Sequence, residues 1–248
     1  MLRSYALTDI GRRRQLNQDF IYCSEGSVGN LPNVFIVADG MGGHNAGGYA
    51  SVLAVETALE EIGASYEKSP VKILDHAITK ANTVLRQRAS EHFSLSGMGT
   101  TMVAATCLGR YLEVANVGDS RLYVVGDEIS QITVDHSLVE EMVRMGGISR
   151  EEARNHPDKN IITRAVGARD EVEIDFFHVE LQTGDMVLLC SDGLTNMVDD
   201  EMIRRILKES GSLRDRVEKL VETANRNGGK DNISVIVIEP LADEVEHD

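Results

Sequence analysis

Residues 100–134, TTMVAATCLGRYLEVANVGDSRLYVVGDEISQITV, decide the fold class of this chain. The stretch holds apolar runs that are typical of β-strands, at residues 100–108, 111–117, 121–125 and 128–134. The pairs Gly109-Arg110 and Gly126-Asp127 separate neighbouring runs. Connections this short predict β-hairpins, in which the strands pair antiparallel.

Apolar runs outside this stretch predict further strands, at residues 34–38, 185–190 and 232–239. Two long helices are predicted, one over residues 46–62 and one from about residue 70 to about residue 92. Ser69 is the expected N-cap of the second helix, and Pro70 suits its first position. Consecutive hairpins together with long helices indicate an α+β fold rather than alternating βαβ units.

Capping residues predict two shorter helices near the C-terminus. Asp199 is placed to cap a helix that stops near Gly211. Ser212 and Asp215 form a capping box, and the helix that follows is expected to end near Gly228.

Length and charge limit the class of protein. A chain of 248 residues can bury a sizeable core, and it has no repeat and no Pro- or Ser-rich linker. We therefore expect one domain, residues 1–241, followed by an acidic tail, residues 242–248. The formal net charge of −15 disfavours nucleic acids and anionic membranes as partners, because both require an excess of Lys and Arg. No apolar run approaches the ~18 residues that span a bilayer.

The cysteines indicate a reducing environment. Cys23, Cys107 and Cys190 are odd in number and widely spaced, which does not suit a disulfide framework. Cys107 and Cys190 lie in apolar runs, where cysteine behaves as a small buried hydrophobe. Because the N-terminus also lacks the apolar segment of a secretory signal, we expect a cytoplasmic protein, and a monomer.

Aspartates occupy the ends of several predicted strands. Asp39, Asp119 and Asp192 follow such strands directly or after one residue, and Asp231 precedes one. Carboxylates that converge repel one another unless a cation binds, and Mg²⁺ and Mn²⁺ prefer oxygen ligands. Gly40 permits a tight turn that can aim its carbonyl at the same ion. An Asp-Gly pair taken alone is usually only a turn, so both interpretations stay open at this point.

Motifs of other catalytic classes are absent from the sequence. No Cys or His spacing suits structural zinc, and there is no HExxH. No arginine lies six residues after a cysteine, as a cysteine phosphatase loop requires. A Walker loop, a dinucleotide fingerprint and a GxSxG elbow are also missing.

A set of short motifs extends over nearly the whole chain, at residues 11–19 (GRRRQLNQD), 37–51 (VADGMGGHNAGGYAS), 97–101 (GMGTT), 117–121 (VGDSR), 135–137 (DHS), 162–167 (ITRAVG), 191–195 (SDGLT) and 228–234 (GGKDNIS). With these motifs in this order, the chain resembles the protein phosphatase 2C family, the metal-dependent Ser/Thr phosphatases, in its compact bacterial form. The resemblance implies a sandwich of two antiparallel β-sheets flanked by helices, with metal ions in a cleft at one end.

The resemblance also implies a set of metal ligands for two core Mn²⁺ or Mg²⁺ ions and a weaker third ion. Asp39 would bridge the core ions, and the Gly40 carbonyl would bind one of them. Asp192 and Asp231 would complete the ligand set of the first ion. Asp119, together with Asp192, would hold the third.

Other positions matched to the family are implied to assist. Asp19 would act through a water molecule, and Asn232 would position its neighbours. Arg14, five residues before Asp19, would grip the substrate phosphate, with Arg12 and Arg13 as alternatives.

His44, in DGMGGH, is the candidate proton donor to the leaving oxygen, although a lone His in a Gly-rich loop is usually only a loop residue. The segment from about residue 142 to about residue 171 resembles the mobile flap of the family. The alternative interpretation is an ordinary surface insertion. Gln18 stands where many eukaryotic members have Glu, which removes one carboxylate near the second metal.

These observations predict a protein Ser/Thr phosphatase in which metal-activated water attacks phosphorus without a phosphoenzyme intermediate. The expected partners are phosphoprotein substrates and a cognate Ser/Thr kinase. Two alternatives remain: a phosphatase for small phosphate esters, and a pseudophosphatase that only binds partners. The second predicts broken metal ligands, whereas the matched aspartates are all present.

Overall fold

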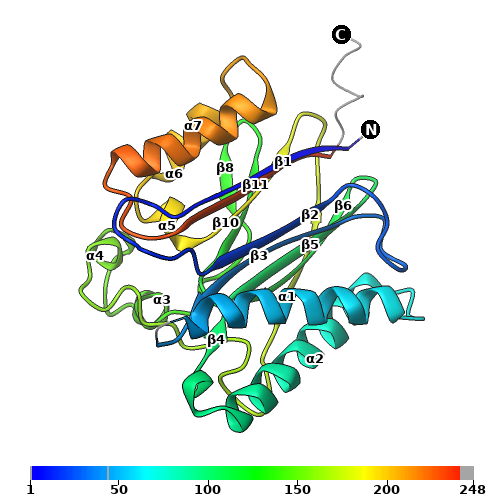
Figure 1. Cartoon of the computed structure of the whole chain (residues 1–248). Coiled ribbons are helices and arrows are strands. Elements are labelled where there is room, and N and C mark those ends of the chain that lie inside the picture. The colour runs from blue at the N-terminus through cyan, green and yellow to red at the C-terminus, as the bar shows by residue number, and fades with distance from the viewer. Residues whose placement is uncertain (1, 44, 241–248) are drawn as a thin grey trace.

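Two β-sheets lie face to face in the computed structural model, which describes residues 2–43 and 45–240. Helices cover the outer face of each sheet, giving four layers (Figure 1). The predicted sandwich of two antiparallel sheets flanked by helices is confirmed. In the described part of the chain, no helix is both long and apolar enough to cross a membrane.

The first sheet contains both ends of the described chain. Its strands, in spatial order, are β1 (Arg3–Asp9), β11 (Ile233–Glu239), β10 (Met186–Cys190), β7 (Arg121–Val125) and β8 (Ile129–Gln131). Every pair is antiparallel.

The second sheet is built mainly from the first half of the chain. Its strands, in spatial order, are β2 (Asp19–Ser24), β3 (Val34–Met41), β5 (Met102–Leu108), β6 (Tyr111–Val117) and β9 (Asp175–Glu180), and β4 (Gly99–Thr100) pairs with the end of β3. These pairs are antiparallel too. The chain passes from the second sheet to the first between β6 and β7, so the turn at Asp119 joins the two layers.

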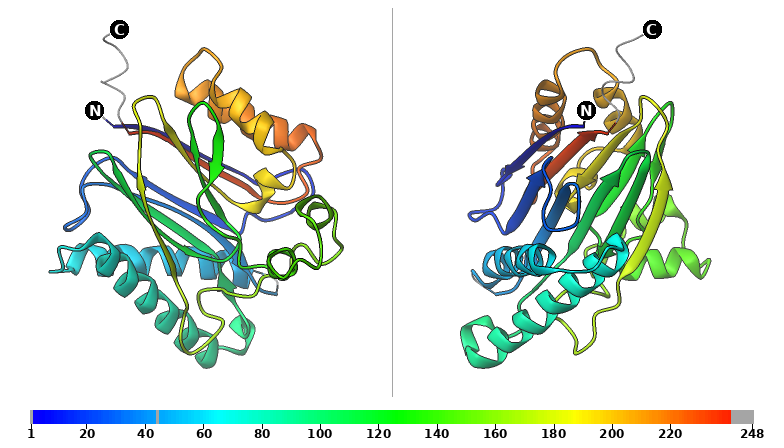
Figure 2. Two further views of the ribbon diagram at one scale, coloured as in Figure 1. Left: turned by 180° about the vertical axis from the view of Figure 1, so that it is seen from behind. Right: turned by 90° about the vertical axis from the view of Figure 1, so that its right-hand side faces the viewer.

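Helices of three groups complete the fold. Helices α1 (Ala46–Ala64) and α2 (Pro70–Glu91), with the short 3₁₀ helix Phe93–Leu95, cover the second sheet. Helices α5 (Asp192–Thr195), α6 (Asp200–Leu207) and α7 (Leu213–Arg226) belong to the first sheet. Helices α3 (Leu138–Arg144) and α4 (Arg150–Arg154) lie at one end of the sandwich in both views of Figure 2.

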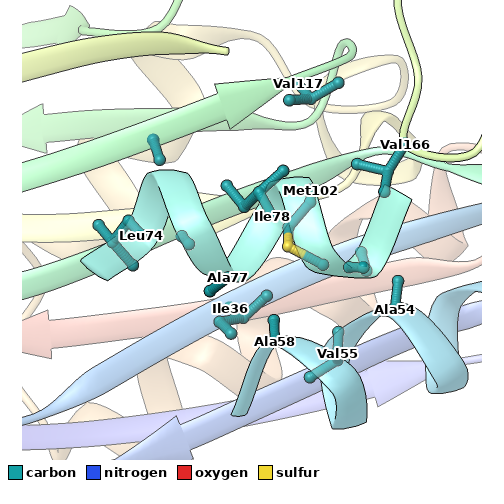
Figure 3. Close-up of a cluster of buried hydrophobic side chains, with 14 of the residues drawn as sticks. Ile36, Ala54, Val55, Ala58, Leu74, Ala77, Ile78, Met102, Val117 and Val166 are labelled. Atoms are coloured by element: carbon teal, nitrogen blue, oxygen red, sulfur yellow. The ribbon is translucent and has the colours of Figure 1, made fainter. Parts of the chain in front are cut away.

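Strand alternation divides the core into layers. Ile36 of β3 faces helices α1 and α2 (Figure 3), whereas its neighbours Phe35 and Val37 face the other sheet. Leu189 and Ile236 meet Phe35 and Val37 from the first sheet. Since both sheets are covered on both faces, their central strands are continuous apolar runs, and their ends are rigidly held.

Several predicted elements are confirmed with small changes in their ends. The hairpins at Gly109-Arg110 and Gly126-Asp127 connect antiparallel strands. The Ser212–Asp215 capping box is present, and the Asp199 side chain accepts a hydrogen bond from the Met202 N–H.

Other predictions were wrong in detail. The strand predicted over 128–134 is only Ile129–Gln131, because the chain turns away after Gln131. The run 100–108 is split at Thr101 into β4 and β5. Ser69 precedes α2 without making a side-chain capping bond, so Pro70 alone marks this helix start.

Candidate active site

The strand pair β2–β3 brings the first two carboxylates together. Asp19 lies directly opposite Asp39 in the antiparallel register. The sequence predicted Asp39 at the tip of a strand. This was wrong, because β3 continues to Met41 and Asp39 lies inside it. Thr101 fixes this position: its hydroxyl accepts a hydrogen bond from the Asp39 N–H (2.9 Å), and its own N–H donates to the Asp39 carbonyl (2.9 Å).

The strand pair β10–β11 supplies the next two carboxylates. Asp192 begins α5, with one residue between it and the end of β10, and Asp231 precedes β11. Gly193 allows the two segments to touch, since a Cβ atom at this position would lie 1.9 Å from the Asn232 carbonyl oxygen. The Ser191 hydroxyl donates to Asp19 Oδ2 at 2.7 Å and thereby connects this sheet to β2.

Gly193→Ala is therefore expected to separate Asp192 from Asp231. The added methyl group must displace backbone, a kind of overpacking that costs about 1–3 kcal/mol. A lower Tm in thermal unfolding, together with weaker metal binding, is the expected result. Gly63→Ala is a matched control in α1, because no atom lies within 4 Å of its added Cβ. Equal Tm values for Gly193→Ala and Gly63→Ala would contradict this role of the close contact.

Burial and mutual repulsion disturb these carboxyl groups. Burial raises the pKa of Asp39 well above its ordinary value, and the charges of Asp19 and Asp192 raise it further. The pKa of Asp192 rises to about 7, first through burial and then through Asp231 and Asp19. Burial likewise raises the pKa of Asp19 to about 6. Burial and the Asp192 charge raise the pKa of Asp119.

This concentration of buried carboxylates fits divalent cations. The oxygens Asp19 Oδ1 and Asp192 Oδ1 are buried and have no hydrogen-bond partner among the described residues. A cation would offset both the repulsion and the unsatisfied oxygens.

No three His, Cys, Asp or Glu side chains within residues 2–43 and 45–240 are already arranged to hold an ion. Two of the carboxylates have protein partners instead, because Asp231 Oδ2 accepts from Arg14 and Asp192 Oδ2 accepts from Asn196. Mg²⁺ and Mn²⁺ retain several water ligands, so a closed protein shell is not required. The pairing of Asp19 with Asp39 and the hydrogen bond from Ser191 to Asp19 show that carboxylates of both sheets lie near one another.

Gly40, the candidate carbonyl ligand, lies in a tight contact. A Cβ atom there would approach the Gly47 carbonyl oxygen to 2.0 Å and the Gln18 carbonyl oxygen to 2.7 Å. The Gly40 N–H donates to the Gln18 carbonyl at 3.1 Å. Only glycine lets β3, the residues before β2 and the start of α1 meet at this point.

Arg14 is the arginine of the N-terminal cluster that faces the carboxylates. Its Nη2 donates to Asp231 Oδ2 at 2.7 Å, and this bond raises the pKa of Arg14. Half of the Arg14 side chain remains exposed. Arg12 and Arg13 are exposed, and the Arg12 backbone N–H donates to the Gly229 carbonyl at 2.7 Å.

Asn232 holds the loop that carries Arg14. Its Nδ2 donates to the carbonyl oxygens of Ile10 (3.0 Å) and Leu16 (2.9 Å), and its Oδ1 accepts from the Gln18 N–H at 2.9 Å. One side chain thus spans the whole loop and fixes both of its ends. The positioning role of Asn232 stays a prediction, and these contacts are its structural basis.

A cleft of about 1080 Å³ opens beside the carboxylates. Asp119 and Asp192 line it on one side, and Arg154 and Lys159 of the 142–171 segment line it on another. Burial lowers the pKa of Lys159, the charge of Lys230 lowers it further, and the charge of Asp192 opposes this. The predicted flap therefore adjoins the carboxylate group.

The structure brings Asp19, Asp39, Asp119, Asp192 and Asp231 into one group, with Arg14, Gly40 and Asn232 at its border. His44 and the 242–248 tail lie outside the described residues. Sequence reasoning missed the supporting roles of Thr101 and Ser191. Thr101 lies in the motif GMGTT and Ser191 in SDGLT. In each case, a hydroxyl side chain near the end of a predicted strand could have indicated the role.

Fold and site together define a metal-dependent phosphatase: a two-sheet sandwich with buried carboxylates at one end and an arginine above them. The comparisons agree, since a family model described as protein phosphatase 2C matches residues 10–236. The chain belongs to the protein phosphatase 2C family.

Similar proteins include bacterial phosphatases of the same length. The serine/threonine phosphatase stp of Listeria monocytogenes is 44% identical over 239 residues, covering 94% of this chain and 93% of the relative. The structure of Stp1 from Staphylococcus aureus is 37% identical, with a TM-score of 0.90 over 96% of this chain and 94% of the other. The catalytic domain of PstP, solved with two manganese ions, is 35% identical, with a TM-score of 0.83 over 96% of this chain and 97% of the other.

Proposed function

We propose that this chain hydrolyses phosphoserine and phosphothreonine in other proteins, and that its buried aspartates hold Mn²⁺ or Mg²⁺. The group of carboxylates that raise one another's pKa, of which Asp119 and Asp192 line the cleft, carries this proposal. The similar PstP domain, which contains two manganese ions, supports it.

Asp39, the Gly40 carbonyl, Asp192 and Asp231 would hold the two core cations, and Asp119 with Asp192 a weaker third. When bound, these cations supply Lewis-acid chemistry, which polarises the phosphoryl group and lowers the pKa of attacking water.

The chain's own residues orient the reaction. Asp19 lies opposite Asp39 and is held by Ser191, so it can accept a hydrogen bond from a water molecule at the site. Arg14 is mounted on a loop that Asn232 fixes, and its guanidinium fork suits two phosphoryl oxygens.

Arg14→Ala is expected to raise KM and lower kcat/KM for a phosphothreonine peptide by roughly 10- to 100-fold. Charge-assisted hydrogen bonds of this kind contribute about 1.5–3 kcal/mol. Arg14→Lys should recover only part of the loss, because an ammonium group cannot form the bidentate fork. Arg12→Ala and Arg13→Ala are the matched controls in the same loop, and wild-type kinetics in Arg14→Ala with losses in a control would move the role to that arginine.

The size and lining of the cleft favour a peptide segment over a small phosphate ester. It is about 1080 Å³ in volume, and its walls extend from Asp192 to the charged side chains of the flap and of α6. Comparing phosphothreonine peptides with sugar and nucleotide phosphates tests this choice. Equal or higher kcat/KM for the small esters would contradict a protein substrate.

We further propose that the chain acts as a cytoplasmic monomer and opposes a cognate Ser/Thr kinase, with the flap contacting the substrate. The kinase assignment follows from the reaction, because each phosphoprotein substrate must first be made by a kinase. Phosphoproteomics of cells with and without this gene would show phosphoserine and phosphothreonine sites that accumulate in its absence. An unchanged phosphoproteome would contradict the proposal that the chain opposes a Ser/Thr kinase.

A further inference from the structure

The turn that carries Asp119 is held by a buried histidine. The Gly118 backbone N–H donates to Nδ1 of the His136 ring at 3.0 Å, and the His136 backbone N–H donates to the Gly118 carbonyl at 3.0 Å. His136 is only 6% exposed. The same turn is held from its other side by Ser120, whose hydroxyl lies 2.7 Å from that of Thr101.

The Gly118 contact determines which nitrogen of the His136 ring acts as the acceptor. A backbone N–H can only donate, so Nδ1 must present its lone pair to Gly118, and a neutral ring then carries its hydrogen on Nε2. Asp175 Oδ2 lies 3.0 Å from Nε2, in position to accept that hydrogen, and Arg164 Nη1 lies 3.3 Å from the same nitrogen. Both ring nitrogens are therefore engaged, one with the Asp119 turn and the other with the start of β9.

The second partner leads to the C-terminal end of the flap. Arg164 donates through Nη1 to Asp175 Oδ1 at 2.9 Å and forms an ion pair with Glu173 at 3.1 Å. The Thr163 N–H donates to the His136 carbonyl at 2.8 Å. The backbone of His136 thus contacts the 142–171 segment at Thr163, and its ring is linked through Asp175 to Arg164 of the same segment.

We propose that His136 is a positioning residue, which ties the end of the flap through Asp175 to the backbone of the Asp119 turn and so sets how tightly Asp119 binds its cation. The proposal rests on the proposed function, in which Asp119 holds the weakest of three ions. This proposal also gives a role to the motifs DHS (135–137) and ITRAVG (162–167), which contain none of the proposed metal ligands.

The test compares variants of the full chain that differ in one contact. His136→Leu keeps a buried side chain but removes both ring hydrogen bonds. His136→Asn retains an acceptor close to the position of Nδ1, but it is too short to reach Asp175. Asp175→Ala leaves the His136–Gly118 contact and removes the carboxylate that joins the ring to Arg164 of the flap. It also provides a second route if His136→Leu does not fold.

Calorimetric titration with Mn²⁺ alone should show the two tighter binding events unchanged and the weakest event weakened roughly tenfold in His136→Leu and Asp175→Ala, the lower range for loss of an outer contact at a metal site. In chelator, the Gly118 amide should exchange faster with solvent in His136→Leu, and His136→Asn should restore its protection.

His178→Leu is the matched control. His178 forms a similar pair with Glu113 (2.7 Å), also involving β9, but its side chain is 59% exposed and far less enclosed. It should change neither readout. Unchanged Gly118 exchange and an unchanged weakest event in His136→Leu would overturn the proposal, as would equal loss of all binding events in a variant with normal Tm. If the wild type binds only two ions, the third-ion assignment fails, and the exchange measurement still decides whether His136 holds the turn.

Discussion

Asp39→Asn is expected to lose roughly 10³-fold or more of the metal-dependent phosphatase activity, because it removes several kcal/mol of cation-based stabilisation. Asp39 lies at the centre of the carboxylate group, and the charges of its neighbours all raise its pKa. An amide of the same size preserves the packing of β3 but removes the charge that two cations would share. The measurement is kcat/KM for a phosphothreonine peptide with saturating Mn²⁺.

The same substitution should stabilise the protein when metal is removed. A pKa that is higher in the folded state than in the unfolded state means that folding favours the protonated form. This stability is present at acidic pH and is lost as pH rises through the folded pKa, which is about 6 for Asp19 and about 7 for Asp192. In chelator at pH 8, Asp39→Asn should therefore have a higher Tm than the wild type, by about 2–4 °C for each kcal/mol of repulsion removed.

The exposed Asp127 in the β7–β8 hairpin provides the control for both measurements. Asp127→Asn should alter neither activity nor Tm in chelator. Wild-type activity in Asp39→Asn, or a Tm in chelator below that of the wild type, would contradict the assignment of Asp39 to a cation site.

His44→Gln is the second substitution with a large expected effect, and it rests on the sequence motif, because His44 lies outside the described residues. A serine or threonine alkoxide is strongly basic and leaves with a proton, so losing the proton donor should slow phosphothreonine hydrolysis by roughly 10²-fold. Nitrophenolate leaves unaided. The loss on p-nitrophenyl phosphate should therefore be much smaller.

The pH dependence supplies an independent readout for His44. With the phosphothreonine peptide, the high-pH decline of the rate should flatten in His44→Gln, because the acid whose deprotonation caused it is gone. Equal losses on both substrates would indicate a structural role instead, and no loss on either would leave His44 an ordinary loop residue.

Burial explains which elements the sequence predicted and which it did not. The central strands β3, β5, β6, β10 and β11 are covered on both faces, so they appear as continuous apolar runs. The missed strands β1, β2 and β9 are all sheet edges with half-buried, mixed side chains. The missed helices α3, α4 and α5 have seven, five and four residues, too few for a clear period.

The site shows a similar division. Asp39, Asp192 and Asp231 could be selected from their places beside apolar strands and from the family motifs. Their convergence could not, because it depends on contacts between distant segments, such as the approach of Gly193 to the Asn232 carbonyl. Periodicity contains no information of this kind.

We propose that divalent cations on these aspartates drive hydrolysis of phosphoserine and phosphothreonine. The decisive measurement is phosphate release from a phosphothreonine peptide by the purified chain, first in Mn²⁺ and then in excess chelator. We expect steady release with Mn²⁺, loss of release in chelator, and recovery when Mn²⁺ is restored in excess. Release that continues unchanged in chelator, or no release from any phosphothreonine peptide with Mn²⁺ or Mg²⁺, would contradict the claim.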